Sequence, residues 1–364
     1  MEETLRPNTA REIKPPVTNV GIIGWMRANL FNGWFNTTLT LIFTYVLYLT
    51  APPFIEWAFI NSNWISTSEE CKASGGACWS VVTANIRFIL FGFYPHALQW
   101  RPLLAVVILV FLLIYSQNRK HWRKSLAYAW AIGLFSMGLL LKGGLFGLES
   151  VDSTNWGGLP LTLLLSVFGL TAAYPVGILL ALGRQSEMPI IKSFCVIYIE
   201  LIRGVPLISL LFMSSVVFPL FLPEGMTINP ILRAQVAIIM FTAAYIAEVV
   251  RGGLQGVDKG QYEAAESLGL NYFQSMRRII LPQALKIAIP PSVSILISAF
   301  KDTSLVVIIA LYDLLKTTQT TLTDPKWMGY SSEAYIFVAL IYFICCFFMS
   351  NYSRKLEREL DTNL

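Results

Sequence analysis

The charged stretch DKGQYEAAESLGLNYFQSMRRII, residues 258–280, separates two apolar runs in the C-terminal half of the chain. One apolar run precedes it at residues 234–250, and the other follows at residues 287–311. Each run is close to the roughly 20 apolar residues needed to cross a bilayer. The charged stretch between them is therefore predicted to lie outside the bilayer.

This stretch has the residue types of two short helices. Residues 261–268 are strong helix formers, and Gly269 can end a helix in the left-handed conformation. Asn271 is a suitable N-cap for a second short helix that ends before Pro282. A solvated loop is the alternative, but a loop has no need of the paired alanines, the glycine and the apolar residues found here. We predict two short helices at an angle, forming a docking knob.

The order Glu263-Ala264-Ala265, Gly269, Leu281-Pro282 resembles the EAA signature of the membrane permease subunits of ATP-binding-cassette importers. The resemblance implies a type I importer permease core whose cytoplasmic coupling helix is held by a separate ATPase. The residues that it assigns to ATPase coupling are Glu263, Ala264, Ala265, Gly269, Leu270, Arg277 and Pro282.

Flanking motifs narrow the resemblance. AYIAE at 244–248, RGGLQ at 251–255, Gly260-Gln261 and KDTSL at 301–305 resemble the polar amino acid branch of these permeases. The N-terminal extension is similar to that of the M-type permease of general L-amino acid importers. That likeness rests on Cys71, Cys78-Trp79 and GFYP at 92–95.

Composition indicates a helical membrane protein. The chain has 364 residues, of which 55% are hydrophobic and 13% charged, and its mean hydropathy is +0.58. A soluble domain usually carries about twice that share of charge. The net charge of +5 need not imply nucleic acid, because Lys and Arg in cytoplasmic loops explain it. The first thirty residues lack the compact apolar core of a cleavable signal peptide.

The fold class is thus an all-α integral membrane protein with about eight transmembrane helices. The expected spans are 34–60, 102–115, 127–148, 157–182, 206–222, 234–250, 287–311 and 334–350. An interfacial helix is expected to end near Arg203-Gly204, before the fifth span. With both termini cytoplasmic, eight spans place every basic loop on the cytoplasmic side of a bacterial inner membrane.

We divide the chain into four parts on this basis. Residues 1–33 are a cytoplasmic tail, and residues 34–150 are an N-terminal transmembrane region with an outer loop at 61–100. Residues 151–353 are the permease core, with the EAA loop at 258–286, and residues 354–364 are a second cytoplasmic tail.

Two similar motifs, Glu200-x-x-Arg203-Gly204 and Glu248-x-x-Arg251-Gly252, each place a carboxylate and a guanidinium on one helical face. They are candidate gate or bracing pairs at the cytoplasmic end of the pathway. The alternative is that each is an ordinary ion pair that neutralises two charges at the interface.

Lys301 and Asp302 lie about fifteen residues into the seventh expected span, near the bilayer midplane. A charge at that depth costs at least about 3 kcal/mol and marks a pathway or a binding site by default. Asp302 would receive the ammonium of an amino acid, and the hydroxyls of Thr303 and Ser304 would bond either end. The alternative is that Lys301 and Asp302 pair with neighbouring helices for assembly only.

Asn36 and Thr38, at the start of the first span, are further candidates for the substrate pathway. Threonine in a membrane helix usually bonds its own backbone, which is the alternative for Thr38. Cys71 and Cys78 are disulfide candidates in the outer loop, given an oxidising compartment.

Little in the sequence suggests catalysis. Only two histidines are present, which argues against histidine triads and metal clusters, so no metal site and no cofactor are expected. The dipeptide Gly-Lys never occurs, so no phosphate-binding loop is present. If ATP drives transport, ATP and Mg²⁺ must bind a partner ATPase, and the chain itself is not an enzyme.

The sequence therefore predicts the permease subunit of an ATP-driven amino acid importer in the lipid bilayer. By resemblance, its partners are a second homologous permease, two ATPase subunits, a periplasmic amino-acid-binding protein and the amino acid substrate. One alternative is a secondary transporter in which Asp302 or Glu248 carries a coupling proton. Another is a membrane scaffold that transports nothing.

Overall fold

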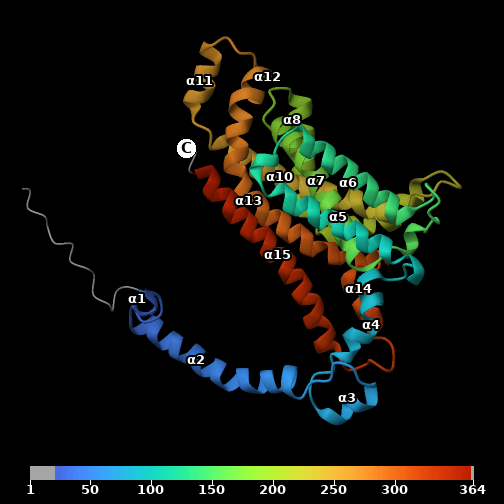
Figure 1. Ribbon diagram of the computed structural model, residues 1–364. Helices are drawn as coiled ribbons and strands as arrows, with labels where there is room; N and C mark the ends of the chain where they lie inside the picture. Colours follow the sequence, from blue (N-terminus) through green and yellow to red (C-terminus); the bar gives the residue numbers. More distant parts are fainter. Residues whose placement is uncertain (1–20, 362–364) are drawn as a thin grey trace, which may run out of the picture. The chain divides into compact units, whose positions relative to one another are not determined.

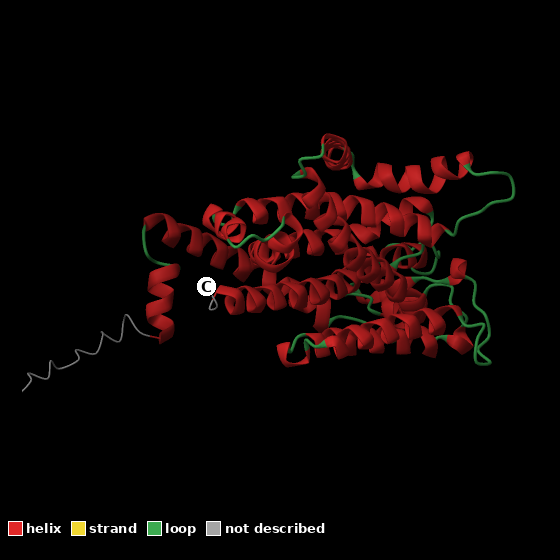
Figure 2. Ribbon diagram, turned by 90° about the horizontal axis from the view of Figure 1, so that it is seen from above, coloured by secondary structure: helices red, strands yellow, loops and turns green. Residues whose placement is uncertain are grey.

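The computed structural model describes residues 21–361, in which helices and loops occur but no β-strand (Figure 2). The chain divides into two compact units, one ending at Ser80 and one beginning at Val81. The sequence instead led us to divide the chain near residue 150. Most of the expected N-terminal tail lies outside the described residues.

The first unit contains α1 (Gly21–Asn29), α2 (Trp34–Ile55) and α3 (Ser68–Ser74). A π-helical turn, Glu56–Ile60, extends α2, so that the apolar helix runs from Trp34 to Ile60 as predicted. Pro52 and Pro53 lie inside α2 without ending it. Thr67 caps α3 with a capping box in which Glu70 is the reciprocal partner.

The second unit is a bundle of long helices with short helices at its ends (Figure 1). Its helices are α4 (Ser80–Phe91), which starts at the unit boundary, α5 (Trp100–Ser116), α6 (Lys124–Lys142), α7 (Gly158–Arg184), α8 (Pro189–Gly204), α9 (Leu207–Phe212), α10 (Pro230–Gln255), α11 (Lys259–Ser267), α12 (Tyr272–Ser275), α13 (Leu281–Asp302), α14 (Leu314–Thr321) and α15 (Ser331–Asp361).

Within residues 21–361, seven helices are long and apolar enough to cross a membrane, or eight if one bent pair counts as a single span. The bent pair is α8 with the segment Leu207–Phe221, and the two parts meet at 105°. The expected break near Arg203-Gly204 is therefore confirmed. Pro206 caps α9 in an extended conformation, which explains the bend.

The helices differ from the predicted segments in three places. The third span ends at Lys142 rather than residue 148, because Gly143 leaves the helix with φ +68°. The predicted C-terminal tail is helical as far as Asp361, because α15 continues past residue 354, and its cytoplasmic location stays a prediction. The segment 81–100, expected at the outer interface, contains the apolar helix α4 and begins α5.

The predicted second knob helix is also wrong. α12 continues through a π-helical turn, Met276–Ile280, into α13, and this helix together with a 3-10 segment reaches Ile309. Pro282 directly follows the π-helical turn, whose irregular hydrogen bonding accommodates the missing N–H, so it does not end the helix. Of the two expected knob helices, α11 alone is separate from the long helix that follows (Figure 1).

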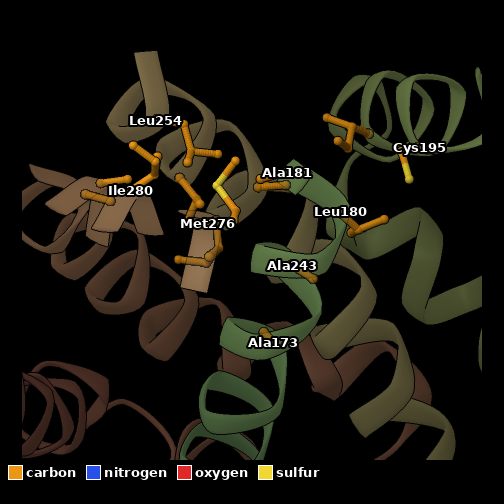
Figure 3. Packing of buried hydrophobic residues seen from close by; sticks show 14 of the residues in the cluster. Ala173, Leu180, Ala181, Cys195, Ala243, Leu254, Met276 and Ile280 are labelled. Carbon is orange, nitrogen blue, oxygen red and sulfur yellow. The ribbon is translucent and has the colours of Figure 1, made fainter. Parts of the chain in front are cut away.

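α10 lies at the centre of the second unit. Thirteen of its 26 residues are buried, and it packs against α7, α8 and α13. The shared core is rich in small side chains, which let membrane helices approach closely (Figure 3). A Cβ on Gly253 would lie 2.4 Å from the carbonyl oxygen of Ala284, so α10 and α13 meet there backbone to backbone.

Candidate functional site

A pocket of about 390 Å³ lies between α10 and α13. Its lining residues are Phe241, Thr242, Tyr245, Ser294, Ile295, Ser298, Ala299 and Asp302. Asp302 is the one charged residue in this lining. The pocket therefore combines an apolar wall with one carboxylate and several hydroxyl groups, which is the usual make-up of a small-molecule site.

Thr242 adds an unsatisfied polar group to this pocket. Its side chain is only 1% exposed, and its Oγ1 has no hydrogen-bond partner among the described residues. A buried hydroxyl without a partner costs about 1–3 kcal/mol. A ligand in the pocket with a polar group near Thr242 would remove that cost.

The pocket contains one of the four polar residues predicted around residue 302. Lys301 is exposed and outside the lining. The Thr303 hydroxyl donates to the carbonyl of Phe300 at 2.7 Å, and that of Ser304 donates to the carbonyl of Lys301 at 2.9 Å. Both hydroxyls thus bond their own backbone, because the helix tightens to a 3-10 segment after Asp302.

The mid-membrane depth of Asp302 stays a prediction, because its helix begins at Tyr272 rather than residue 287 and is longer than a bilayer requires. Asp302 lies near the C-terminal end of that helix, which is Ile309. Asn36 and Thr38 belong to the first unit and make local bonds. Asn36 donates to Asn32 Oδ1, and Thr38 donates to the carbonyl of Trp34 at 2.9 Å.

The sequence contained a signal for the missed pocket residues. Ser294, Ser298 and Asp302 are four residues apart and share one face of α13. Reading that face towards the N-terminus from Asp302 would have found both serines. The partner wall on α10 depends on which helix packs there, which the sequence alone did not indicate.

An ion-pair cluster joins α7, α8 and α10. Glu248 lies at its centre, with Arg184 at 2.7 Å, Arg251 at 3.0 Å and Arg203 at 3.6 Å. Of the two predicted pairs, Glu248 with Arg251 is present. The other is wrong, because Glu200 instead pairs with Arg184 at 2.9 Å. Arg184, at the end of α7, was not predicted.

The cluster reaches the pocket through Tyr245. The guanidinium of Arg203 lies 5.6 Å from the centre of the Tyr245 ring, which is a cation–π distance. Tyr245 lines the pocket and contacts the Phe241 ring at 4.9 Å. A movement of the helix ends at the cluster would therefore shift Tyr245, which forms part of the pocket wall.

The knob, defined here as α11 with residues 268–273, is capped at both ends. The Asp258 side chain accepts from the N–H of Gly260 at 2.7 Å. At the other end, the N–H of Leu270 donates to Ala265 and that of Gly269 donates to Glu266. Gly269 has φ +70°, which confirms the predicted left-handed helix end, and the two bonds form a Schellman motif.

One face of the knob is exposed and apolar. Leu268, Tyr272 and Phe273 are 75%, 62% and 68% exposed. Glu263 and Ala264 on α11 are exposed too, as are Arg277 and Pro282 in the helix that follows the knob. Ala265 is buried and Leu270 half-buried, so these two hold the knob rather than form its surface. An exposed apolar patch rimmed by charges is typical of a protein-docking surface.

The knob is continuous with the core of the second unit. The Tyr262 hydroxyl donates to the carbonyl of Leu254 at 3.1 Å, and burial raises the pKa of this phenol. Leu254, Met276 and Ile280 belong to the same buried cluster as Ala173 and Ala243, deep in α7 and α10 (Figure 3). A force on the knob therefore acts on packed side chains that extend to the helix carrying the pocket.

In the first unit, Cys71 and Cys78 are joined by a disulfide, with their Cα atoms 5.5 Å apart. The neighbouring rings of Trp64 and Trp79 stack at 5.6 Å, and the Trp79 indole donates to the carbonyl of Ala58. Cys195, Cys345 and Cys346 are free thiols.

Known proteins resemble this chain along most of its length. Residues 173–362 match the family described as binding-protein-dependent transport system inner membrane component. The chain is 47% identical over 342 residues to the inner membrane amino-acid ABC transporter permease protein YhdY of Escherichia coli (strain K12), with 93% of each chain covered. It is 39% identical to the glutamate/glutamine/aspartate/asparagine transport system permease protein BztC of Rhodobacter capsulatus, with 98% of this chain and 97% of BztC covered.

A solved structure matches the C-terminal part. The crystal structure of an amino acid ABC transporter with histidines aligns with a TM-score of 0.50 and 33% identity. The alignment covers 56% of this chain and 92% of that one.

The fold and the matches define a multi-pass inner membrane transport component with the type I permease fold. The chain belongs to the family of amino-acid ABC transporter permeases and is the permease subunit of an ATP-driven amino acid importer. It is a transport component and not an enzyme, and the comparisons do not favour a proton-coupled transporter or a scaffold.

Proposed function

We propose that the pocket between α10 and α13 contacts the amino acid during its passage, with Asp302 receiving the substrate ammonium. The observation that carries this proposal is a single carboxylate facing the same pocket as a buried hydroxyl without a partner. Every amino acid has an α-ammonium group, so this contact suits a broad set of substrates. The relatives named for acidic residues and their amides, and for histidine, agree with such breadth.

The exposed face of the knob is the proposed contact for an ATPase subunit. Glu263, Ala264, Arg277 and Pro282 would touch the ATPase, while Ala265, Gly269 and Leu270 keep α11 in place. Closure of two ATPase subunits around ATP and Mg²⁺, both bound on those chains, would push the knob. The buried cluster in α7, α10 and α13 would carry that movement to the pocket.

The remaining parts of the proposal concern the assembly. Both termini and the knob face the cytoplasm, which places the basic residues 119–124 and 354–358 there too. A second homologous permease completes the pathway, and a periplasmic binding protein delivers the amino acid. The cluster around Glu248 then braces three helix ends on the cytoplasmic side and opens or tightens as the permeases rock.

The test is ATP hydrolysis by the co-purified assembly in nanodiscs, with and without binding protein loaded with different amino acids. We expect Asp302→Asn to reduce the stimulated rate at least about tenfold, the effect of losing one charge-assisted hydrogen bond. Ser304→Ala is the matched control, since its hydroxyl bonds the chain's own backbone. For the knob, Glu263→Lys should lose the ATPase during purification, whereas Glu187→Lys, in an exposed loop between α7 and α8, should keep it.

The outcomes separate the parts of the proposal. Full stimulation of the Asp302→Asn assembly would remove Asp302 as a substrate contact and leave the coupling proposal standing. Retention of the ATPase by Glu263→Lys would contradict the knob as the docking surface.

A further inference from the structure

A second group of polar residues lies where the C-terminal ends of α5 and α15 come together. One pocket there, of about 530 Å³, is lined by Ile114, Gln117, Asn118, Lys120, Lys355 and Glu359. An adjoining pocket of about 400 Å³ shares Lys355 and Glu359 and adds Asn351, Arg354 and Arg358. We call the two together the basic pocket. None of these residues belongs to the transport site described above.

The basic pocket carries a surplus of positive charge. Four of its lining side chains are cations, Lys120, Lys355, Arg354 and Arg358, and Glu359 is its one carboxylate. Lys120 and Lys355 are exposed and come from segments more than two hundred residues apart in the sequence. The amides of Gln117 and Asn118 add neutral hydrogen-bonding groups. A ligand that fits this pocket has a negative centre and a few hydroxyl groups.

Apolar side chains lead away from the basic pocket along both helices. On α5, Ile114 and Phe111 lie on one helical face and are 61% and 62% exposed. On α15, Phe348 and Ile344 share the face of Lys355 and are 62% and 44% exposed. Both helices are long and apolar enough to cross a membrane. A polar pocket thus lies at the end of two exposed apolar strips.

We propose that the basic pocket binds the head group of an anionic phospholipid of the phosphatidylglycerol type. The phosphate lies between Lys120 and Lys355, and the glycerol hydroxyls donate to the carboxylate of Glu359. The acyl chains follow the apolar strips of α5 and α15. Basic pockets between transmembrane helices bind anionic head groups in this way, and each lysine near the phosphate strengthens binding severalfold. The site is independent of the transport proposal.

The alternative is that a basic loop attracts anionic lipid without a defined site. Residues 119–124 contain several cations, and Arg123 and Lys124 lie outside the basic pocket. The double variant Arg123→Gln with Lys124→Gln therefore removes the same amount of charge, all of it from residues 119–124, but leaves the pocket intact. It is the matched control for Lys120→Gln with Lys355→Gln.

Native mass spectrometry of the delipidated importer complex, titrated with phosphatidylglycerol or with phosphatidylcholine of the same acyl chains, tests the proposal. We expect wild type to bind a first phosphatidylglycerol at least about tenfold more tightly than phosphatidylcholine. The pocket variant should lose about tenfold in this affinity, and the loop control should stay within about twofold. A parallel titration with inorganic phosphate should give no competition at millimolar concentration.

Three results would overturn the proposal. Equal binding of the two lipids by wild type would mean that the apolar strips alone retain lipid. Equal losses in the two variants would mean attraction by the loop without a site. Competition by inorganic phosphate would identify an anion site that needs no lipid.

Discussion

α2 and α10 are both long apolar helices, yet they differ in burial and in where their polar side chains find hydrogen-bond partners. Within its unit α2 buries no side chain, and four of its threonines donate to carbonyls of the same helix, as Thr44 does to Thr40 at 2.8 Å. α10 buries half of its residues, and several of its polar side chains reach other helices. Glu248 joins α7 and α8, and Gln235 donates to the carbonyl of Leu165 on α7.

The difference shows which helix can transmit a movement. A helix whose polar side chains bond carbonyls of the same helix can slide or tilt without breaking bonds to its neighbours. A helix bound through small-residue contacts and polar bridges moves only together with those neighbours. α10 connects the buried cluster next to the knob with the pocket, and its small and polar residues provide these contacts to neighbouring helices. The predictions below test that contrast through stability and transport, from the largest expected effect to the smallest.

The largest effect is expected at Glu248. Glu248→Gln leaves Arg184, Arg203 and Arg251 near one another without their shared carboxylate, whose side chain is only 17% exposed. Removing one partner from a largely buried ion cluster costs about 3 kcal/mol or more. We expect a marked fall in the thermal unfolding midpoint of the purified protein in detergent.

The control for this variant is Glu200→Gln. Glu200 is 55% exposed and has Arg184 as its ion-pair partner, so its loss should cost less than about 1 kcal/mol. Equal effects of the two substitutions would show that Glu248 is not the centre of the cluster.

Asp313 gives the second prediction, because it too is a polar group that bridges elements. It is fully buried and caps α14 by accepting from the N–H groups of Leu315 and Lys316. Burial raises the pKa of Asp313 from 3.8 to about 6. Between these values the folded protein binds more protons than the unfolded chain, so the contribution of this group to stability falls as pH rises, and the loss is complete above about pH 6.

Thermal unfolding of wild type and Asp313→Asn at pH 5 and pH 7.5 measures this contribution. Asparagine keeps an N-cap but does not titrate, so the variant should gain about 1.4 kcal/mol on wild type between pH 5 and pH 7.5, which corresponds to the one pH unit between pH 5 and the folded pKa of about 6. A difference between the two proteins that is the same at both pH values would contradict the raised pKa.

Gly253 tests the close contact of α10 with α13. Gly253→Ala places a Cβ 2.4 Å from the Ala284 carbonyl oxygen, so the helices must separate, at a cost of about 1–3 kcal/mol. The neighbouring Gly252 has nothing within 4 Å of such a Cβ. Gly252→Ala should therefore be neutral or slightly stabilising, because alanine favours a helix. Similar midpoints for the two variants would show that the contact at Gly253 is loose.

The sequence predicted the helical class, most of the spans and the knob helix, because apolar runs and cap residues act locally. The Schellman end at Gly269 is an example, since a glycine after a helix former suffices to predict it. The boundary at Pro282 was wrong for a reason of context. Proline breaks a regular helix interior, but the π-helical turn directly before Pro282 interrupts the regular hydrogen bonding, so the helix continues past this proline.

The candidate site was only partly predictable. A charge in an apolar run identified Asp302, but the residues next to it in sequence point elsewhere, while those four and eight positions earlier share its pocket. To predict Thr242 and Tyr245 as pocket residues, one would have had to know that α10 packs on α13. Glu200 likewise has a partner on α7 rather than three residues away, because the ends of three helices meet.

The smallest effects on stability compare one substitution in the two helices. Thr242→Val on α10 removes a buried hydroxyl that has no partner among the described residues, so it should stabilise the protein by about 1 kcal/mol. Thr44→Val on α2 removes a hydroxyl that bonds its own helix, and should change stability by less than about 0.5 kcal/mol. Amino-acid-stimulated ATP hydrolysis should fall for Thr242→Val and stay unchanged for Thr44→Val. If Thr242→Val lowers the unfolding midpoint, its hydroxyl already has a partner in the protein without substrate, and it is not held ready for a ligand.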